Sequence, residues 1–62
     1  MQLADPHETS RLLRVEVSTL AAWRVSGRGP KYRKHGGRVF YTLEDLRSWS
    51  DSQVRRSTSD TD

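Results

Sequence analysis

Residues 15–41 read VEVSTLAAWRVSGRGPKYRKHGGRVFY, and this stretch joins a helical pattern to a break and then to strand-like runs. Leu20 and Trp23 recur at helical spacing, which predicts one apolar helix face. The GRGP sequence at residues 27–30 then stops the helix, because glycine favours turns and proline cannot continue a helix. The stretch therefore predicts a short helix followed by a change to extended structure.

A β-hairpin is predicted next. Two short runs, residues 31–34 and 38–41, flank the Gly-Gly pair at residues 36–37, which is a strong hairpin signal. Side chains alternate between the two faces of a strand, so Val39 and Tyr41 are expected to face the core together. A two-stranded hairpin is not stable alone, and it must therefore pack against the helices.

Basic residues are concentrated in the same stretch. No acid lies between Glu16 and Glu44, although the net charge of the chain is only +3. Six of the eleven Lys and Arg residues fall there: Arg24, Arg28, Lys31, Arg33, Lys34 and Arg38. Such a basic stripe is typical of a nucleic-acid binder, and the alternative is a solvated basic surface with no partner. If most of the six each neutralise one phosphate, the slope of log affinity against log salt should be about −4 to −5.

The N-terminal part predicts a first helix over residues 6–13. Asp5 is a favourable N-cap, and Glu8 stands three positions later, as in a capping box. Leu12 and Leu13 are expected to form the buried edge of this helix. Two turns of helix are too short to be stable alone, so the helix must pack on its neighbour.

The second helix is predicted from residue 16 or 17 to residue 25. Its inward face is expected to carry Thr19, Leu20 and Trp23. Its outward face is expected to carry Ser18, Ala21, Ala22 and Val25. Two short helices joined by a tight turn match a helix-turn-helix, although periodicity also allows a plain helical corner in a small bundle.

Thr42 predicts the start of a third helix over residues 43–51, with Leu46 and Trp49 on one face. The tryptophans of the chain are expected to be core anchors. Residues 52–62 lose this pattern, are rich in serine, threonine and charge, and are expected to form a disordered tail. The predicted fold is therefore α+β: a winged helix-turn-helix domain over residues 1–51, with two N-terminal helices, a two-stranded β-hairpin wing and a short C-terminal helix.

Composition limits the possible functions. With 62 residues, the chain holds one domain at most, and it has no cysteine to supply a disulfide or thiolate metal ligand. No apolar run is long enough for a membrane span or signal peptide, so a cytoplasmic location and no membrane partner are expected. His7 and His35 have no neighbouring nucleophile or carboxylate pair. We therefore expect no enzyme activity, no catalytic residue, no metal site and no cofactor.

The combined pattern resembles small MerR-like winged-helix proteins, above all the excisionases (recombination directionality factors) of phages and mobile elements. AlpA-type regulators share much of it. The resemblance covers about residues 3–49, and the TLAAWR and GRGPKY segments are its most specific parts. It is carried by Leu13, Val15, Thr19, Leu20, Trp23, Arg24, Gly27, Gly29, Pro30, Tyr32, Gly37, Arg38, Val39, Tyr41, Leu46 and Trp49.

The resemblance implies binding of double-stranded DNA, with the second helix in the major groove and the wing at the adjacent minor groove. Arg38 or Lys34, beside the glycine turn, is expected to reach the minor groove. The expected DNA-binding residues are Val17, Ser18, Ala21, Ala22, Arg24, Arg28, Lys31, Arg33, Lys34, His35 and Arg38. Relatives usually carry serine at the position of Glu16, and many carry arginine or another polar residue at those of Ala21 and Ala22.

Three functions are consistent with the sequence. The first is an excisionase that bends attachment-site DNA, associates cooperatively on it and assists an integrase. The second is a small transcriptional regulator of the same fold, which would bind promoters instead. The third is a protein-interaction adaptor that uses Phe40 and the tail without nucleic acid. The short length, with no effector or dimerisation domain, favours the first.

Overall fold

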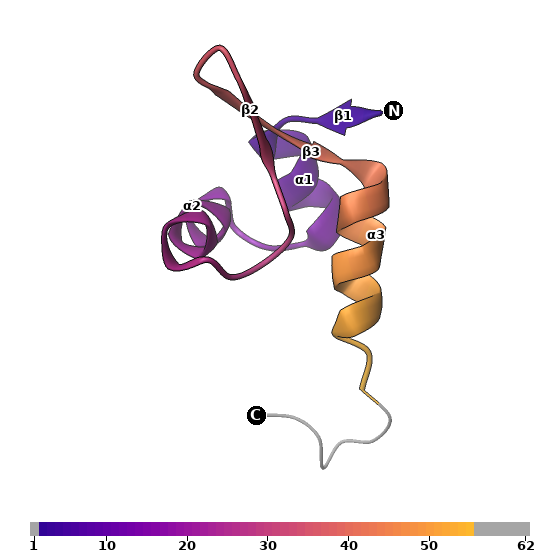
Figure 1. Cartoon of the computed structure of the whole chain (residues 1–62). Helices are drawn as coiled ribbons and strands as arrows, with labels where there is room; N and C mark the ends of the chain where they lie inside the picture. Colours follow the sequence, from indigo (N-terminus) through magenta and orange to yellow (C-terminus); the bar gives the residue numbers. More distant parts are fainter. Residues whose placement is uncertain (1, 56–62) are drawn as a thin grey trace.

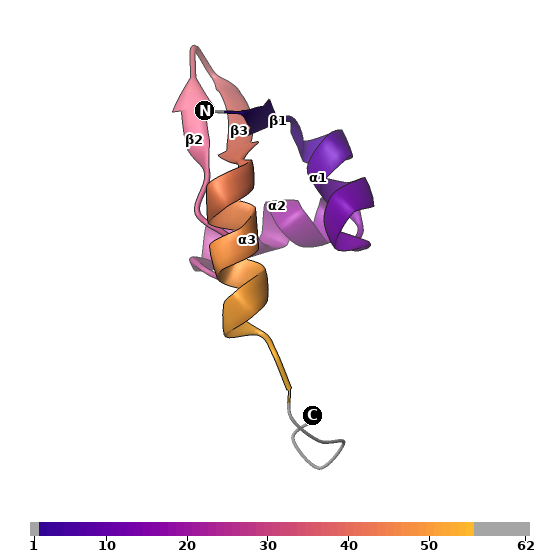
Figure 2. The same cartoon turned by 90° about the vertical axis from the view of Figure 1, so that its right-hand side faces the viewer.

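The computed structural model describes residues 2–55, which form three helices and a small antiparallel sheet (Figure 1). The elements in chain order are β1 (Leu3–Ala4), α1 (Pro6–Leu13), α2 (Val17–Ser26), β2 (Arg33–His35), β3 (Arg38–Thr42) and α3 (Leu43–Ser52). The predicted α+β winged helix-turn-helix is confirmed. The tip of the β2–β3 hairpin and the end of α3 point in opposite directions (Figure 2).

Helix α1 begins at the predicted cap. The Asp5 carboxylate accepts a hydrogen bond from the Glu8 backbone N–H at 2.8 Å, and the Asp5 backbone N–H donates to the Glu8 carboxylate at 3.0 Å. This reciprocal pair satisfies two of the N–H groups that a helix N-terminus leaves without partners. The predicted capping box is therefore confirmed.

The turn between α1 and α2 is held by Ser10. Its hydroxyl donates to the Val15 carbonyl at 2.7 Å, while the Val15 N–H donates to the Ser10 carbonyl at 3.2 Å. Arg14 adopts a left-handed conformation with φ 58°, which turns the chain between the helices. At the far end, Gly27 terminates α2 with φ 77°. These contacts build the helix-turn-helix.

The sheet has the order β1-β3-β2. The first strand of the hairpin was expected at residues 31–34 but occupies Arg33–His35, because pairing with β3 begins only at Arg33 opposite Phe40. The sequence also did not predict β1, which pairs Ala4 with Tyr41 and Leu3 with Thr42. The wing hairpin is therefore extended into a three-stranded sheet, in which β1 pairs with the edge of β3 opposite to β2.

The core lies between the helices and β3. Its buried apolar side chains are Ala4, Leu20, Tyr41 and Leu46. The expectation that Leu12 is buried was wrong: 61% of its surface is exposed, and α1 instead buries Thr9 on its inward side. Trp23 and Trp49 are half-buried, not fully buried as core anchors would be. Their rings pack at 5.3 Å between centroids with an interplanar angle of 47° and so join α2 to α3.

Helix α3 begins as predicted, because the Thr42 hydroxyl accepts a hydrogen bond from the Asp45 N–H at 3.0 Å. It ends at Ser52, one residue later than expected. Residues 56–62 of the expected tail lie outside the described residues. No helix in the part of the chain that is described is long and apolar enough to span a membrane.

Candidate nucleic-acid interface

The outward face of α2 is small and mostly apolar. Ser18 and Ala22 are exposed, Ala21 is half-buried, and Val25 has 90% of its surface exposed. Val17, at the first turn, is half-buried. The expected outward face of α2 is therefore confirmed for Ser18, Ala22 and Val25, with Leu20 fully buried on the other side, whereas Ala21 is only partly exposed. Of the outward side chains, Ser18 alone carries a hydrogen-bonding group, so this face offers few atoms for reading base edges.

The wing separates its basic residues onto two faces. Lys34 pairs with Val39, while His35 pairs with Arg38, and successive residues of a strand point to opposite faces. Lys34 therefore shares a face with Val39 and the buried Tyr41, whereas Arg38 lies on the opposite face. The His35 ring packs against Phe40 on that second face, with 5.5 Å between ring centroids. Arg38 and Lys34, either of which was expected to reach the minor groove, thus point to different sides of the hairpin.

Arg24 connects α2 to the sheet. Its guanidinium donates a hydrogen bond to the Tyr41 hydroxyl at 2.7 Å. The same guanidinium lies over the Tyr32 ring, 5.9 Å from its centroid, and the two tyrosine rings are 6.4 Å apart. Tyr41 is 1% exposed, so the hydroxyl that holds Arg24 belongs to the core. Arg24 is thus oriented by two contacts, not extended freely into solvent.

A groove runs between α2 and the wing, with a volume of about 430 Å³. We call it the α2–wing groove; it is lined by Ala21, Arg24, Val25, Tyr32, Lys34 and Val39. Its two charged residues are both cations, and they come from α2 and the wing, the two elements that the resemblance led us to expect at DNA. The fold therefore brings together Ala21, Arg24 and Lys34 of the expected DNA-binding residues.

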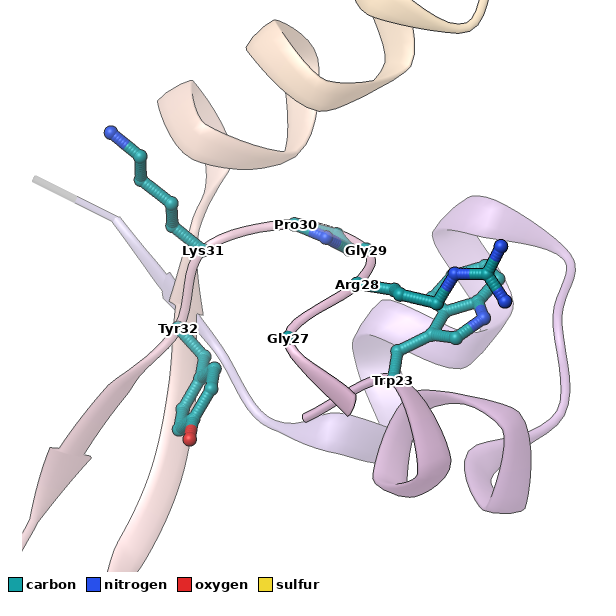
Figure 3. Close-up of a pocket in the computed structure, with 7 residues that line it drawn as sticks. All are labelled: Trp23, Gly27, Arg28, Gly29, Pro30, Lys31 and Tyr32. Atoms are coloured by element: carbon teal, nitrogen blue, oxygen red, sulfur yellow. The ribbon is translucent and has the colours of Figure 1, made fainter. Parts of the chain in front are cut away.

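Three other cations of the basic stripe lie toward α3. Arg28 lines a hollow with Trp23 and Trp49, and Lys31 lines one with Trp49 and Asp45. Figure 3 shows that Lys31 and Tyr32 leave the chain in opposite directions, so Lys31 points away from the Tyr32 side. Arg33 lies 3.9 Å from the Asp45 carboxylate. These three side chains are therefore not gathered with Arg24 and Lys34.

Glu16 is the N-cap of α2, yet its side chain makes no capping hydrogen bond. The first turn of α2 contains no acid either. A helix N-terminus carries a partial positive charge and free N–H groups, which favour an anion. Glu16 adds a negative charge beside this end without satisfying its N–H groups.

Sequence reasoning did not identify Tyr32 as part of the interface. Tyr32 stands two positions before Lys34, and this spacing places both on one face of an extended segment. The alternation of side chains along an extended segment could therefore have identified Tyr32 from the sequence. The hydrogen bond between Arg24 and Tyr41 had no such signal, because the two residues are 17 positions apart in the chain.

Comparison with known proteins agrees with this geometry. A search of curated proteins and a search of solved structures find no match. A family model described as a helix-turn-helix domain matches residues 5–54, most of the chain and all of α1, α2, the wing and α3. That family is a small group of DNA-binding domains that includes excisionase-like proteins. The chain therefore belongs to the helix-turn-helix domain family and is a DNA-binding domain.

Proposed function

We propose that this protein is an excisionase-type accessory factor, which binds and bends attachment-site DNA and so directs integrase-mediated excision. In this proposal α2 enters the major groove and the β2–β3 wing contacts the adjacent minor groove. The protein performs no chemistry itself. Its role is to shape the DNA on which an integrase acts.

The outward face of α2 carries this proposal. Good bidentate contacts to base edges contribute about 1–3 kcal/mol each to sequence discrimination, but alanine and valine can at most touch a thymine methyl. Ser18 supplies the hydroxyl of this face, beside Ala21, Ala22 and the exposed Val25. One protomer should therefore discriminate poorly, and selectivity should come from DNA shape and from several protomers on neighbouring sites. An architectural factor that binds several sites works in this way.

The first test measures binding to DNA with one, two and four copies of a duplex selected from a random pool. We expect weak, poorly selective binding to one copy, much tighter binding to four copies, and bent DNA in the four-copy complex. Footprinting reports occupancy, and end-to-end energy transfer reports bending. Tight and selective binding of a monomer to one isolated site, with no gain from neighbours, would contradict the proposal.

The second test separates excision from gene regulation. An excisionase should stimulate excision by an integrase encoded beside it, with purified DNA and no transcription. A transcriptional regulator of the same fold would leave this reaction unchanged and would alter transcription from a nearby promoter. Stimulated excision supports the proposal, and promoter control without stimulation supports the regulator.

A further inference from the structure

The α2–wing groove has the chemistry of a site for a single anion flanked by apolar groups. Arg24 and Lys34 contribute positive charge from two elements, and Ala21, Val25 and Val39 contribute apolar surface. Of the described residues that line the groove, none is acidic. A backbone phosphate with its deoxyribose has this same combination of a charged group and an apolar ring.

The position of the groove also suits a DNA strand. If α2 occupies the major groove and the wing the adjacent minor groove, the strand that separates the two grooves must cross the gap between these elements. The α2–wing groove is that gap, because its lining residues come from α2, from the wing strands and from the segment that joins them. This step rests on the proposed docking of α2 and the wing.

Arg24 is prepared for such a contact. A guanidinium has five N–H donors in a rigid fork, and the hydrogen bond to the Tyr41 hydroxyl is made by one terminal nitrogen. The contact with the Tyr32 ring restricts the side chain further. A side chain that is ordered before binding loses less conformational entropy when it binds, so the remaining donors are available at low cost.

We propose that Arg24 and Lys34 bind the same backbone phosphate of the duplex, and that Tyr41 is a positioning residue for Arg24. The phosphate lies between the helix and the wing, with its deoxyribose against the apolar wall of the groove. Tyr41 acts through Arg24 and does not itself touch DNA. The Tyr41 hydroxyl belongs to the core and holds the Arg24 guanidinium in place. Through Arg24 it fixes the position of the phosphate relative to α2 and the wing.

The experiment uses the full chain and duplexes in which one phosphate at a time is replaced by an uncharged methylphosphonate. The variants are Arg24→Gln, Lys34→Gln and the double variant, with Arg47→Gln as the matched control because Arg47 is an exposed cation on α3. Thermal melts confirm folding of each variant. Affinity is measured over a range of salt concentrations, since the salt slope counts neutralised phosphates at about −0.9 each.

We expect each single groove variant to lose about tenfold in affinity, as for loss of a charge-assisted contact. The slope should become shallower by about 1 in the double variant and by less in each single variant, because either cation still neutralises the phosphate. One methylphosphonate position should weaken the wild type and leave the double variant unaffected. Arg47→Gln should behave as wild type.

Loss of about 2 from the slope in the double variant, or separate methylphosphonate positions for Arg24 and Lys34, would overturn the shared phosphate. Wild-type affinity of the double variant would overturn it as well, while leaving DNA binding intact. Absence of duplex binding by the wild type would instead remove the proposed function. The two failures are therefore distinguishable.

Tyr41→Phe tests the positioning role, because it removes the hydroxyl and keeps the buried ring. We expect affinity to fall by about three- to tenfold in the wild-type background and not at all in the Arg24→Gln background, since contacts that act through one another are not additive. A purely structural role would lower the melting temperature equally in both backgrounds and would weaken binding in both. That outcome would overturn the assignment of Tyr41.

Discussion

At Gly29 the backbone lies directly against a side chain. The residue has φ 76°, and a Cβ built there would lie 2.5 Å from the Trp23 indole. Gly29→Ala should lower the free energy of unfolding by about 2–4 kcal/mol, because left-handed strain adds to the steric clash. Urea denaturation followed by tryptophan fluorescence measures the change.

Gly36→Ala is the matched control for this prediction. Gly36 also has a positive φ, 57°, but a Cβ there meets nothing within 4 Å. Gly36→Ala should therefore lower the free energy of unfolding only through left-handed backbone strain, by about 1–2 kcal/mol. Equal losses at Gly29 and Gly36 would show that contact with Trp23 contributes nothing.

Glu16 is a second position where one side chain decides an outcome. Its extended backbone suits an N-cap, but its carboxylate forms no cap. Glu16→Ser should raise the free energy of unfolding by about 0.5–1 kcal/mol by capping α2. It should also tighten DNA binding at low salt, because a negative charge beside the helix N-terminus is removed.

Glu44→Ser serves as the comparison for Glu16. Glu44 is an exposed acid in the first turn of α3, where Thr42 already supplies the cap. Its removal should therefore not stabilise the protein. If Glu16→Ser and Glu44→Ser change stability alike, the missing cap at α2 has no energetic consequence.

Among the secondary-structure elements, α2 and α3 are joined through the half-buried Trp23–Trp49 pair. Trp23→Ala should lower the free energy of unfolding by about 2–3 kcal/mol, less than the ~3–5 kcal/mol typical of a fully buried tryptophan. A domain this small has little stability to lose. Val25→Ala, on the exposed side of α2, should leave stability unchanged. A Trp23→Ala variant with the wild-type melting temperature would contradict the packing role.

The wing is expected to place Arg38 at the minor groove. Arg38 is the β3 residue that follows the glycine turn, and narrow grooves of A·T-rich DNA attract such cations. Arg38→Ala should weaken binding more on A·T-rich than on G·C-rich flanks. Arg33→Ala provides the contrast, because Arg33 lies near Asp45 and should affect both flanks alike. Equal loss for Arg38→Ala on both flanks would indicate plain phosphate contact.

For the whole molecule, the arrangement of the cations changes the expected salt dependence. If most of the six basic residues each neutralised one phosphate, the slope would be about −4 to −5. Arg28, Lys31 and Arg33 lie toward α3, and Arg24 and Lys34 are proposed to share one phosphate. With a second phosphate for Arg38, we expect a slope of about −2 per bound protomer. Titrations between low and moderate salt measure it. A slope near −5 would mean that the α3-side cations also reach DNA, and one near −1 that the basic stripe is not the contact surface.

Local signals in the sequence were enough to determine the helices, the hairpin and most of the outward face of α2. The Asp5–Glu8 box, the Thr42 cap and the stop at Gly27 act within a few residues, so the sequence specifies them directly. The hairpin turn at Gly36-Gly37 is local in the same sense. These features depend on backbone geometry and neighbouring side chains, which composition and spacing reveal.

The tertiary structure alone decided which cations share a surface. The sequence places six Lys and Arg residues in one stripe. Packing, however, directs Arg24 and Lys34 into one groove and Arg28 toward the α3 side. The pairing of β1 with β3 and the contact between Arg24 and Tyr41 join residues far apart in the chain. Such contacts depend on how the helices and the sheet pack together, and no local pattern in the sequence records that arrangement.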